Sequence, residues 1–380
     1  MKIELSKSQK EHQAKFREFV EKEVVPNAGE FDLEQRIPDA FIAKLAGAGY
    51  LTAVLPEQYG GRSMDMITYG LLNKELGRGC TSVRSLVMLQ NMIALSLSKW
   101  GSREQKETWL GRISSGESIA AFALTEPDVG SDAKNIETSA NRQGDGYLLN
   151  GRKKWVSLGQ IADVFLTFAQ CDGKLCAFLV ERDTPGMTIE PIRNMLGVRA
   201  SMLAEVVFHN CAVPETSLVG GIGFGFVPVG IMALNLGRYS IAWGCVGIAQ
   251  ACLEACIEHT STRKQFGVYL KEHQLIKRKI ANMIVNIKAA RLLCYQAGCS
   301  EELGGPDSVM ETMIAKYFAT TMATKVANDA VQIHGALGCS DSAAVARHMR
   351  DARIMEIIEG TSEIHQLKIA EFGYQKYGQD

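Results

Sequence analysis

The feature of this sequence that most constrains its fold is a double change in hydrophobic periodicity along the 380 residues. Up to about residue 117, apolar residues recur at intervals of three and four, as in Phe16, Phe19, Val20 and Val24. Between about 118 and 222, short β-rich runs alternate with turn dipeptides, and from 223 the helical spacing returns. Because each period suits only one kind of element, this order predicts an α+β protein. We expect a helical domain (1–117), an antiparallel β-domain (118–222) and a helical bundle (223–380).

Local signals set the expected ends of several elements. Ser6 can cap the first helix, Pro26 would end it, and Pro38 suits the first turn of the next one. Further helices are expected near residues 65–78, 82–100, 102–114, 227–259, 273–300 and 308–337. Asp172-Gly173 lies between two β-rich runs and predicts a hairpin, because both residues accept the positive φ of a tight primed turn. Ligand sites favour domain junctions, so a cofactor is expected between the sheet and the bundle.

Composition excludes several classes of protein. The formal net charge is −1, from 41 basic and 42 acidic residues, which argues against a nucleic-acid-binding protein. No run approaches 18 apolar residues and the opening segment is charged. We therefore expect neither a membrane span nor a secretion signal, and a cytoplasmic location. The ten cysteines lack the spacing of metal ligands, so they are expected to be reduced thiols that fill the core, with no metal site.

Two segments in the β-region carry residues suited to a flat ligand with a polar edge. FALTEPDVGSD (122–132) runs from a strand into a turn whose N–H groups and Ser131 hydroxyl can face an anionic or carbonyl group. KKWVSLG (153–159) places Trp155 two residues before the hydroxyl of Ser157, a pair that suits a heterocyclic ring. Taken alone, the first segment could equally be an ordinary turn, and the second could hold a core tryptophan.

Two segments in the last region carry candidate contacts to a phosphate group. STRKQFG (261–267) is a basic turn before a helix, which by itself is typical of solvated surface, although Arg263 offers paired donors and a fixed charge. QIHGALG (332–338) holds Gln332 and Gly335, and its His334 is a less favoured candidate for an acid–base group.

The segment ARIMEIIEGTSEIHQ (352–366) contains two glutamates, Glu356 and Glu359, before Gly360. Read alone, it is a helix with surface carboxylates that ends at the glycine. In the order and at the intervals found here, these segments resemble the acyl-CoA dehydrogenase family over essentially the whole chain. The resemblance implies a C-terminal four-helix bundle, FAD as the cofactor, and Glu359 as the base that removes a proton alpha to a thioester carbonyl.

The resemblance also assigns the contacts of the two ligands. Implied cofactor-binding residues are Phe122, Leu124, Thr125, Ser131, Trp155, Ser157, Arg263, Phe266, Gln274, Gln332, Gly335, Thr361 and Glu363. Implied substrate-binding residues are Ser131, Asn235, Arg238 and Gly360. In the family, the matches to Arg263 and Phe266 contact the FAD of a neighbouring subunit, which implies a homodimer or homotetramer. An electron acceptor such as an electron-transfer flavoprotein is implied as well.

Some positions depart from the usual family pattern. Ile358 precedes the base where many members have tyrosine, Ala336 replaces a glycine, and Asp128 replaces a small residue. Ile358 and the segment GALGCS resemble a branch that oxidises small hydroxyacyl or aminoacyl groups on an acyl carrier protein, in polyketide and nonribosomal peptide extender-unit biosynthesis. The alternative is a catabolic short- or branched-chain acyl-CoA dehydrogenase. A flavin-binding protein without dehydrogenase activity and a flavin monooxygenase are further alternatives, and Glu359 argues against both.

Overall fold

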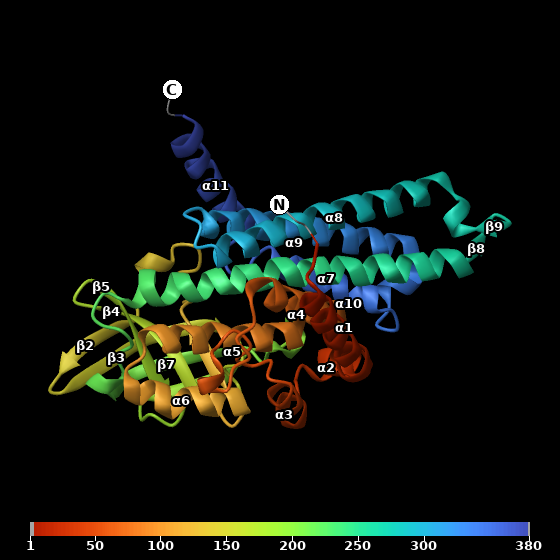
Figure 1. Ribbon diagram of the computed structural model, residues 1–380. Coiled ribbons are helices and arrows are strands. Elements are labelled where there is room, and N and C mark those ends of the chain that lie inside the picture. Colours follow the sequence, from red (N-terminus) through yellow and green to blue (C-terminus); the bar gives the residue numbers. More distant parts are fainter. Residues whose placement is uncertain (1–3, 379–380) are drawn as a thin grey trace.

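The computed structural model describes residues 4–378 (Figure 1). The N-terminal region is helical, as predicted, and Ser6 caps its first helix in a capping box with Gln9. Its helices are α1 (Lys7–Phe19), α2 (Ala28–Glu34), α3 (Asp39–Gly47), α4 (Met66–Gly79), α5 (Thr81–Trp100) and α6 (Arg103–Ser115). Pro26 does not end the helical path as expected. It lies in a 3-10 turn (Val25–Asn27) that leads directly into α2, where the missing N–H of proline costs nothing.

The central region is a seven-stranded sheet in the order β1-β4-β2-β3-β7-β6, with β5 paired to β4. Its strands are β1 (Ala120–Ala123), β2 (Ser139–Gln143), β3 (Gly146–Val156), β4 (Val164–Cys171), β5 (Lys174–Glu181), β6 (Met187–Pro191) and β7 (Ala204–Pro214). The hairpin at Asp172-Gly173 is confirmed, because φ is 50° and 71° at these residues and Cys171 pairs with Lys174. Most pairings are antiparallel, whereas β1–β4 and β2–β4 are parallel.

The C-terminal region is a bundle of long helices. They are α7 (Met232–Thr262), α8 (Gln274–Glu302), α9 (Ser308–His334), α10 (Ala344–Met355) and α11 (Ser362–Tyr377). A π-helical turn (Gly225–Ile231) containing Pro228 precedes α7, so the α-helix begins later than predicted. A short hairpin, β8 (Lys264–Gln265) and β9 (Val268–Tyr269), joins α7 to α8 at the far end of the bundle (Figure 1).

Helix α7 runs along the molecule, with the N-terminal helices on one side and α8 and α9 on the other (Figure 1). Within the described residues, Gly225–Thr262 is the one helix long and apolar enough to cross a membrane, and 72% of its most apolar stretch is buried, as in a core helix. One hydrophobic core joins the N-terminal helices to the bundle. A second lies between α5, α6 and the sheet. Helix α5 therefore contacts both cores and stands at the junction where the cofactor was expected. All ten cysteines are free thiols, and eight of them are buried.

Candidate active site

A cavity of about 610 Å³ opens at this junction. Its walls come from α5, the segment after β1, the end of β3, the loop before β7, α7, and the loop between α10 and α11. The lining includes most residues that the sequence assigned to the flavin or the substrate: Phe122, Leu124, Thr125, Ser131, Trp155, Ser157, Arg238, Glu359, Gly360 and Thr361. Four predicted parts of the sequence, residues 122–131, 155–157, 238 and 359–361, therefore meet at one place.

Glu359 lies in the loop between α10 and α11, in a conformation that few residues adopt. Its φ is 55°, and φ of the following Gly360 is 98°, so both residues are left-handed. A left-handed conformation costs a residue with a side chain about 1–2 kcal/mol and persists only where surrounding contacts fix it. Here, Arg238 Nε donates to the carbonyl oxygen of Glu359 at 3.0 Å, and Lys316 Nζ donates to that of Gly360 at 2.6 Å.

The Glu359 residue is partly buried, and one oxygen of its carboxylate is removed from solvent. Its Oε2 atom is buried and has no hydrogen-bond partner in the described chain. Burial raises the pKa of Glu359, while the cations Arg238, Lys316 and Arg84 act in the opposite direction. A raised pKa makes the carboxylate a stronger base, which suits a general base that must accept a weakly acidic proton.

Gly237 provides the space that this carboxylate occupies. A Cβ atom at Gly237 would lie 3.2 Å from Cδ of Glu359 and 2.9 Å from Sδ of Met92. The glycine on α7 and the glutamate on the loop therefore face the same point of the cavity.

The two segments expected along the flavin are tied together by the Lys153 side chain. Its Nζ atom donates to the carbonyl oxygen of Leu124 at 3.0 Å and to Oε1 of Glu126 at 2.7 Å, and both side chains are buried. Burial lowers the pKa of Lys153 to about 8. The Lys154 N–H also donates to the carbonyl oxygen of Thr125 at 2.8 Å. This pair of segments forms one continuous wall of the cavity.

Trp155 projects from this wall with a ring that suits a flat cofactor. It has a φ of 61°, just where the β3–β7 register breaks, and it remains 47% exposed. The Ser157 hydroxyl lines the same cavity two residues later. A fixed, half-exposed indole beside a hydroxyl fits the face and polar edge of a flavin ring.

Other predicted residues lie outside the cavity in the described chain. Asn235 donates from its amide to Glu301 at 3.3 Å, and Glu363 lies in the first turn of α11. Arg263, Phe266 and Gln274 lie at the far end of α7 and the start of α8, and Phe266 is 95% exposed. Gln332 and Gly335 lie at the end of α9. One chain alone does not bring Arg263, Phe266, Gln274, Gln332 and Gly335 to the cavity.

Two alternative acid–base groups are also outside the cavity. Glu356 forms an ion pair with Arg353 at 3.3 Å. His334 stacks on His259 with ring centroids 4.4 Å apart, and its Nδ1 lies 2.8 Å from the carbonyl oxygen of Ala330. Glu359 is the cavity carboxylate with a raised pKa.

Sequence reasoning missed several residues that build the site. Ser85, Met88 and Leu89 of α5 line the cavity, as do Met195, Gly197, Val198, Ser201 and Leu203 from the loop before β7. Asp351 holds that loop by accepting a hydrogen bond from the Val198 N–H at 2.6 Å. The one available signal was Arg84, a charge within the apolar run of α5.

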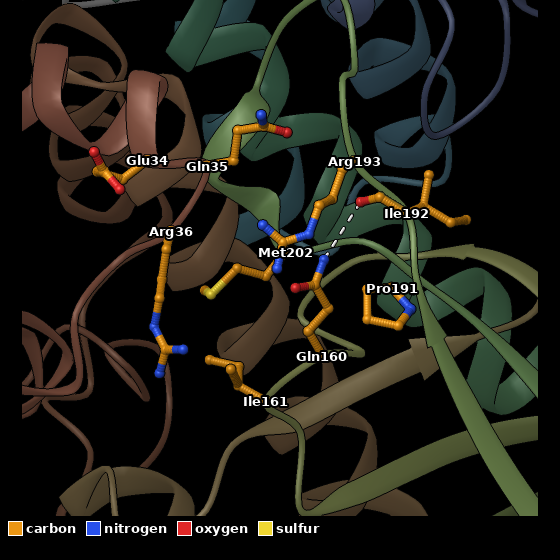
Figure 2. A pocket seen from close by; sticks show the side chains of 9 residues that line it. All are labelled: Glu34, Gln35, Arg36, Gln160, Ile161, Pro191, Ile192, Arg193 and Met202. Atoms are coloured by element: carbon orange, nitrogen blue, oxygen red, sulfur yellow. Dashed lines mark hydrogen bonds between the residues drawn. The ribbon is translucent and has the colours of Figure 1, made fainter.

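A smaller hollow of about 160 Å³ lies beside the same loop. Figure 2 shows Arg36 and Arg193 around it, with Gln160 donating to the carbonyl oxygen of Ile192 at 3.3 Å. The Gln160 amide also donates to the carbonyl oxygen of Leu203 at 2.8 Å. None of the residues predicted for the active site lines this hollow, and Gln160 acts there to fix the loop.

Family models match nearly the whole chain. They are described as the acyl-CoA dehydrogenase N-terminal domain, which matches residues 6–117, middle domain, residues 121–211, and C-terminal domain, residues 227–373. A similar curated protein is the human mitochondrial short-chain specific acyl-CoA dehydrogenase, 38% identical over 93% of this chain and 87% of that protein. Another is the probable acyl-CoA dehydrogenase YngJ of Bacillus subtilis, 38% identical over 97% of this chain and 99% of that protein.

Solved structures with the same fold are named for different substrates or products. A glutaryl-CoA dehydrogenase of Mycobacterium smegmatis in complex with FADH2 has a TM-score of 0.93 and 31% identity, over 99% of this chain and 96% of that chain. The prolyl acyl carrier protein oxidase AnaB has a TM-score of 0.92 and 28% identity, over 97% and 99%. FkbI, for biosynthesis of a methoxymalonyl extender unit, has a TM-score of 0.87 and 30% identity, over 96% and 99%.

Proposed function

Because the chain belongs to the acyl-CoA dehydrogenase family of flavin-binding oxidoreductases, we propose that it oxidises a small acyl thioester with FAD and uses Glu359 as the base. The observation that carries this proposal is the Glu359 loop. A left-handed glutamate, clamped through its own carbonyl group and that of Gly360, places a buried carboxylate in the cavity.

The residues around the cavity fit FAD. The wall formed by Phe122, Leu124 and Thr125, with Trp155 and Ser157, would hold the flavin ring. We propose that a second copy of the chain holds the rest of the FAD molecule, because the other predicted cofactor residues lie far from the Glu359 loop of their own chain. These residues are Arg263, Phe266, Gln274, Gln332 and Gly335. When bound, FAD supplies the acceptor for the hydride that leaves the β-carbon.

The chain itself provides the base, a hydrogen bond to the thioester oxygen and the exclusion of water. Glu359 accepts the α-proton, a role favoured by its raised pKa. The N–H of Glu359 has no acceptor among residues 4–378 and would donate to the thioester oxygen as negative charge develops there. Such a donor typically contributes about 3 kcal/mol in a site that excludes water. Ile354, Ile357 and Ile358 line the cavity and provide that exclusion.

We further propose that the acyl group is small and is carried by an acyl carrier protein. Ile358, in place of a tyrosine beside the base, supports this tether, and two similar structures are named for reactions of carrier-bound or extender-unit substrates. A carrier protein adds binding surface outside the cavity, and remote binding energy can position the α-carbon against Glu359. A small polar acyl group, which buries little apolar surface, needs that contribution most.

A second candidate is oxidation of a short-chain acyl-CoA. The 38% identity to short-chain specific acyl-CoA dehydrogenase favours it. Anaerobic mixing with paired thioesters, in which one acyl group is carried either by CoA or by a carrier protein, separates the two. Faster loss of flavin absorbance with the carrier protein supports the first proposal. Rapid bleaching by butyryl-CoA, with no response to any carrier-bound thioester, supports the second.

A further inference from the structure

Arg84 is a buried cation without an anionic partner. Its side chain is fully buried, in the first turn of α5. The guanidinium donates to the hydroxyl oxygen of Ser240 at 3.0 Å and to that of Ser85 at 2.8 Å. It also contacts the sulfur atoms of Met88 at 3.1 Å and Met355 at 3.6 Å, and its Nε atom has no partner. No carboxylate among residues 4–378 lies within ion-pair distance of it.

The other buried cations of this protein bind either a carboxylate or a backbone carbonyl group. Lys316, which forms no ion pair among residues 4–378, donates to the carbonyl oxygen of Gly360 at 2.6 Å. Lys74 and Arg78 both bind Glu75, at 2.7 and 3.1 Å, and Lys153 binds Glu126 at 2.7 Å. Removing a charge from water without a partner is strongly unfavourable, which is why buried charges are normally paired. Arg84 has neither kind of partner, since its acceptors are two hydroxyl groups and two sulfur atoms, so an additional partner for its site is expected from outside the protein.

The Arg84 site opens onto the cavity through Ser85. Ser85 and Met88, two of the four groups that contact the guanidinium, line the cavity wall. A serine hydroxyl has one donor and two acceptor positions. Because Ser85 Oγ accepts from Arg84, its O–H hydrogen is left to donate to something else. Arg84 also lies close enough to Glu359 to affect its pKa, so this wall belongs to the reacting end of the cavity.

We propose that Ser85, held and polarised by Arg84, forms a subsite for a hydrogen-bond-accepting oxygen on the acyl group, a hydroxyl or a carboxylate. This inference rests on the proposed function and narrows its substrate class. An acyl group that carries an ammonium would place a second positive charge beside Arg84 and is disfavoured. A plain alkyl chain would leave the Ser85 hydroxyl unpaired and is accepted poorly.

The test compares related acyl groups on the same pantetheine arm. Because the carrier is identical, differences in rate or affinity come from the acyl group alone. Butyryl, 4-hydroxybutyryl, glutaryl and 4-aminobutyryl thioesters are each assayed for kcat/KM by flavin reduction and for Kd by calorimetry. The wild-type protein should prefer the 4-hydroxybutyryl or glutaryl thioester over butyryl by roughly tenfold or more, with 4-aminobutyryl the poorest. In R84M the ratio of kcat/KM for the 4-hydroxybutyryl or glutaryl thioester to that for butyryl should fall to about one. K99M, which removes an exposed cation from the same helix, should keep the wild-type ratio.

Two results would overturn the subsite. One is a wild-type protein that prefers butyryl thioester, and the other is an R84M variant that weakens all four thioesters equally. If R84M does not fold, S85A, which removes only the hydroxyl, must lose the preference instead. A wild-type protein that binds these thioesters but reduces its flavin with none of them contradicts the proposed function. In that case, the ratio of the Kd for butyryl thioester to that for the 4-hydroxybutyryl or glutaryl thioester still tests whether the subsite exists.

Discussion

Arg238 donates a hydrogen bond from Nε to the carbonyl oxygen of Glu359, at 3.0 Å, across 121 residues of sequence. This bond fixes the backbone of the base to α7, and Lys316 fixes the next carbonyl group to α9. The direction of the Glu359 side chain therefore depends on two cations that lie on different helices.

We expect G237A to lose activity while keeping the fold. The added methyl group would lie 3.2 Å from Cδ of Glu359 and 2.9 Å from Sδ of Met92, so the carboxylate must move. The contact requires a shift of a few tenths of an ångström, and since a misplacement of about 1 Å can cost about 10²-fold in rate, we expect a loss of up to about tenfold. FAD content and Tm should change little. G373A, where a Cβ atom meets nothing within 4 Å, is the control and should behave as wild type. Full activity of G237A would show that the carboxylate does not need this space.

Activity should fall at both low and high pH, which gives the pH profile an acid limb and an alkaline limb. Burial raises the pKa of Glu359, so activity falls as pH drops through a value above 4.5, where the base becomes protonated. Burial lowers the pKa of Lys316 to about 8, so its charge is lost as pH rises through that value. Glu359 then loses one neighbouring cation and the loop is held less firmly, and activity should decline.

K316M tests the alkaline limb. The variant should be slower than wild type by roughly tenfold at neutral pH, because the loop loses one clamp. Its profile should show no further decline near pH 8. K368M, which removes a surface cation paired with Glu371, should keep both limbs. An unchanged alkaline limb in K316M would exclude Lys316 as its source.

K153M should destabilise the protein and release FAD. The substitution leaves the Glu126 carboxylate buried without its cation, and breaking a buried pair in this way typically costs about 3–5 kcal/mol. Thermal unfolding and the flavin-to-protein absorbance ratio measure the two effects. K174M, at an exposed position on β5, should show neither. Wild-type Tm and FAD content in K153M would mean that the tie between the two wall segments is dispensable.

R263A should lose FAD and weaken assembly together. Arg263 lies near the exposed Phe266, at the opposite end of α7 from the π-helical turn, and we propose that it contacts the cofactor of another copy. Light scattering combined with flavin absorbance reports both properties. A wild-type protein that is a stable monomer with one FAD per chain would contradict the shared site.

Local signals predicted much of the fold. The Ser6 cap and the Asp172-Gly173 hairpin depend on residues close together in sequence, and both are found where expected. The path through Pro26 and the parallel β1–β4 pairing were not predicted, because tertiary packing decides them.

The site was predicted only in part, because some of its contacts also depend on tertiary packing. Motifs located the residues of the flavin wall and Glu359, because they lie in compact segments. Lys316 lies 44 residues from Gly360, and only the packing of α9 against the loop shows their contact. Arg84 was not predicted, because its lack of an anionic partner is visible only in the folded chain.

The most direct test of the proposed chemistry is anaerobic stopped-flow reduction of the flavin in E359Q, with the thioester that the wild-type protein oxidises fastest. The substitution keeps the volume and a hydrogen-bonding end, so FAD content and Tm should be retained, while the reduction rate should fall by ~10²–10⁴ or more. E356Q changes the neighbouring glutamate, which is paired with Arg353 outside the cavity, and should reduce its flavin at close to the wild-type rate. A near-normal rate in E359Q, or a large loss in E356Q alone, would contradict the assignment of Glu359 as the base.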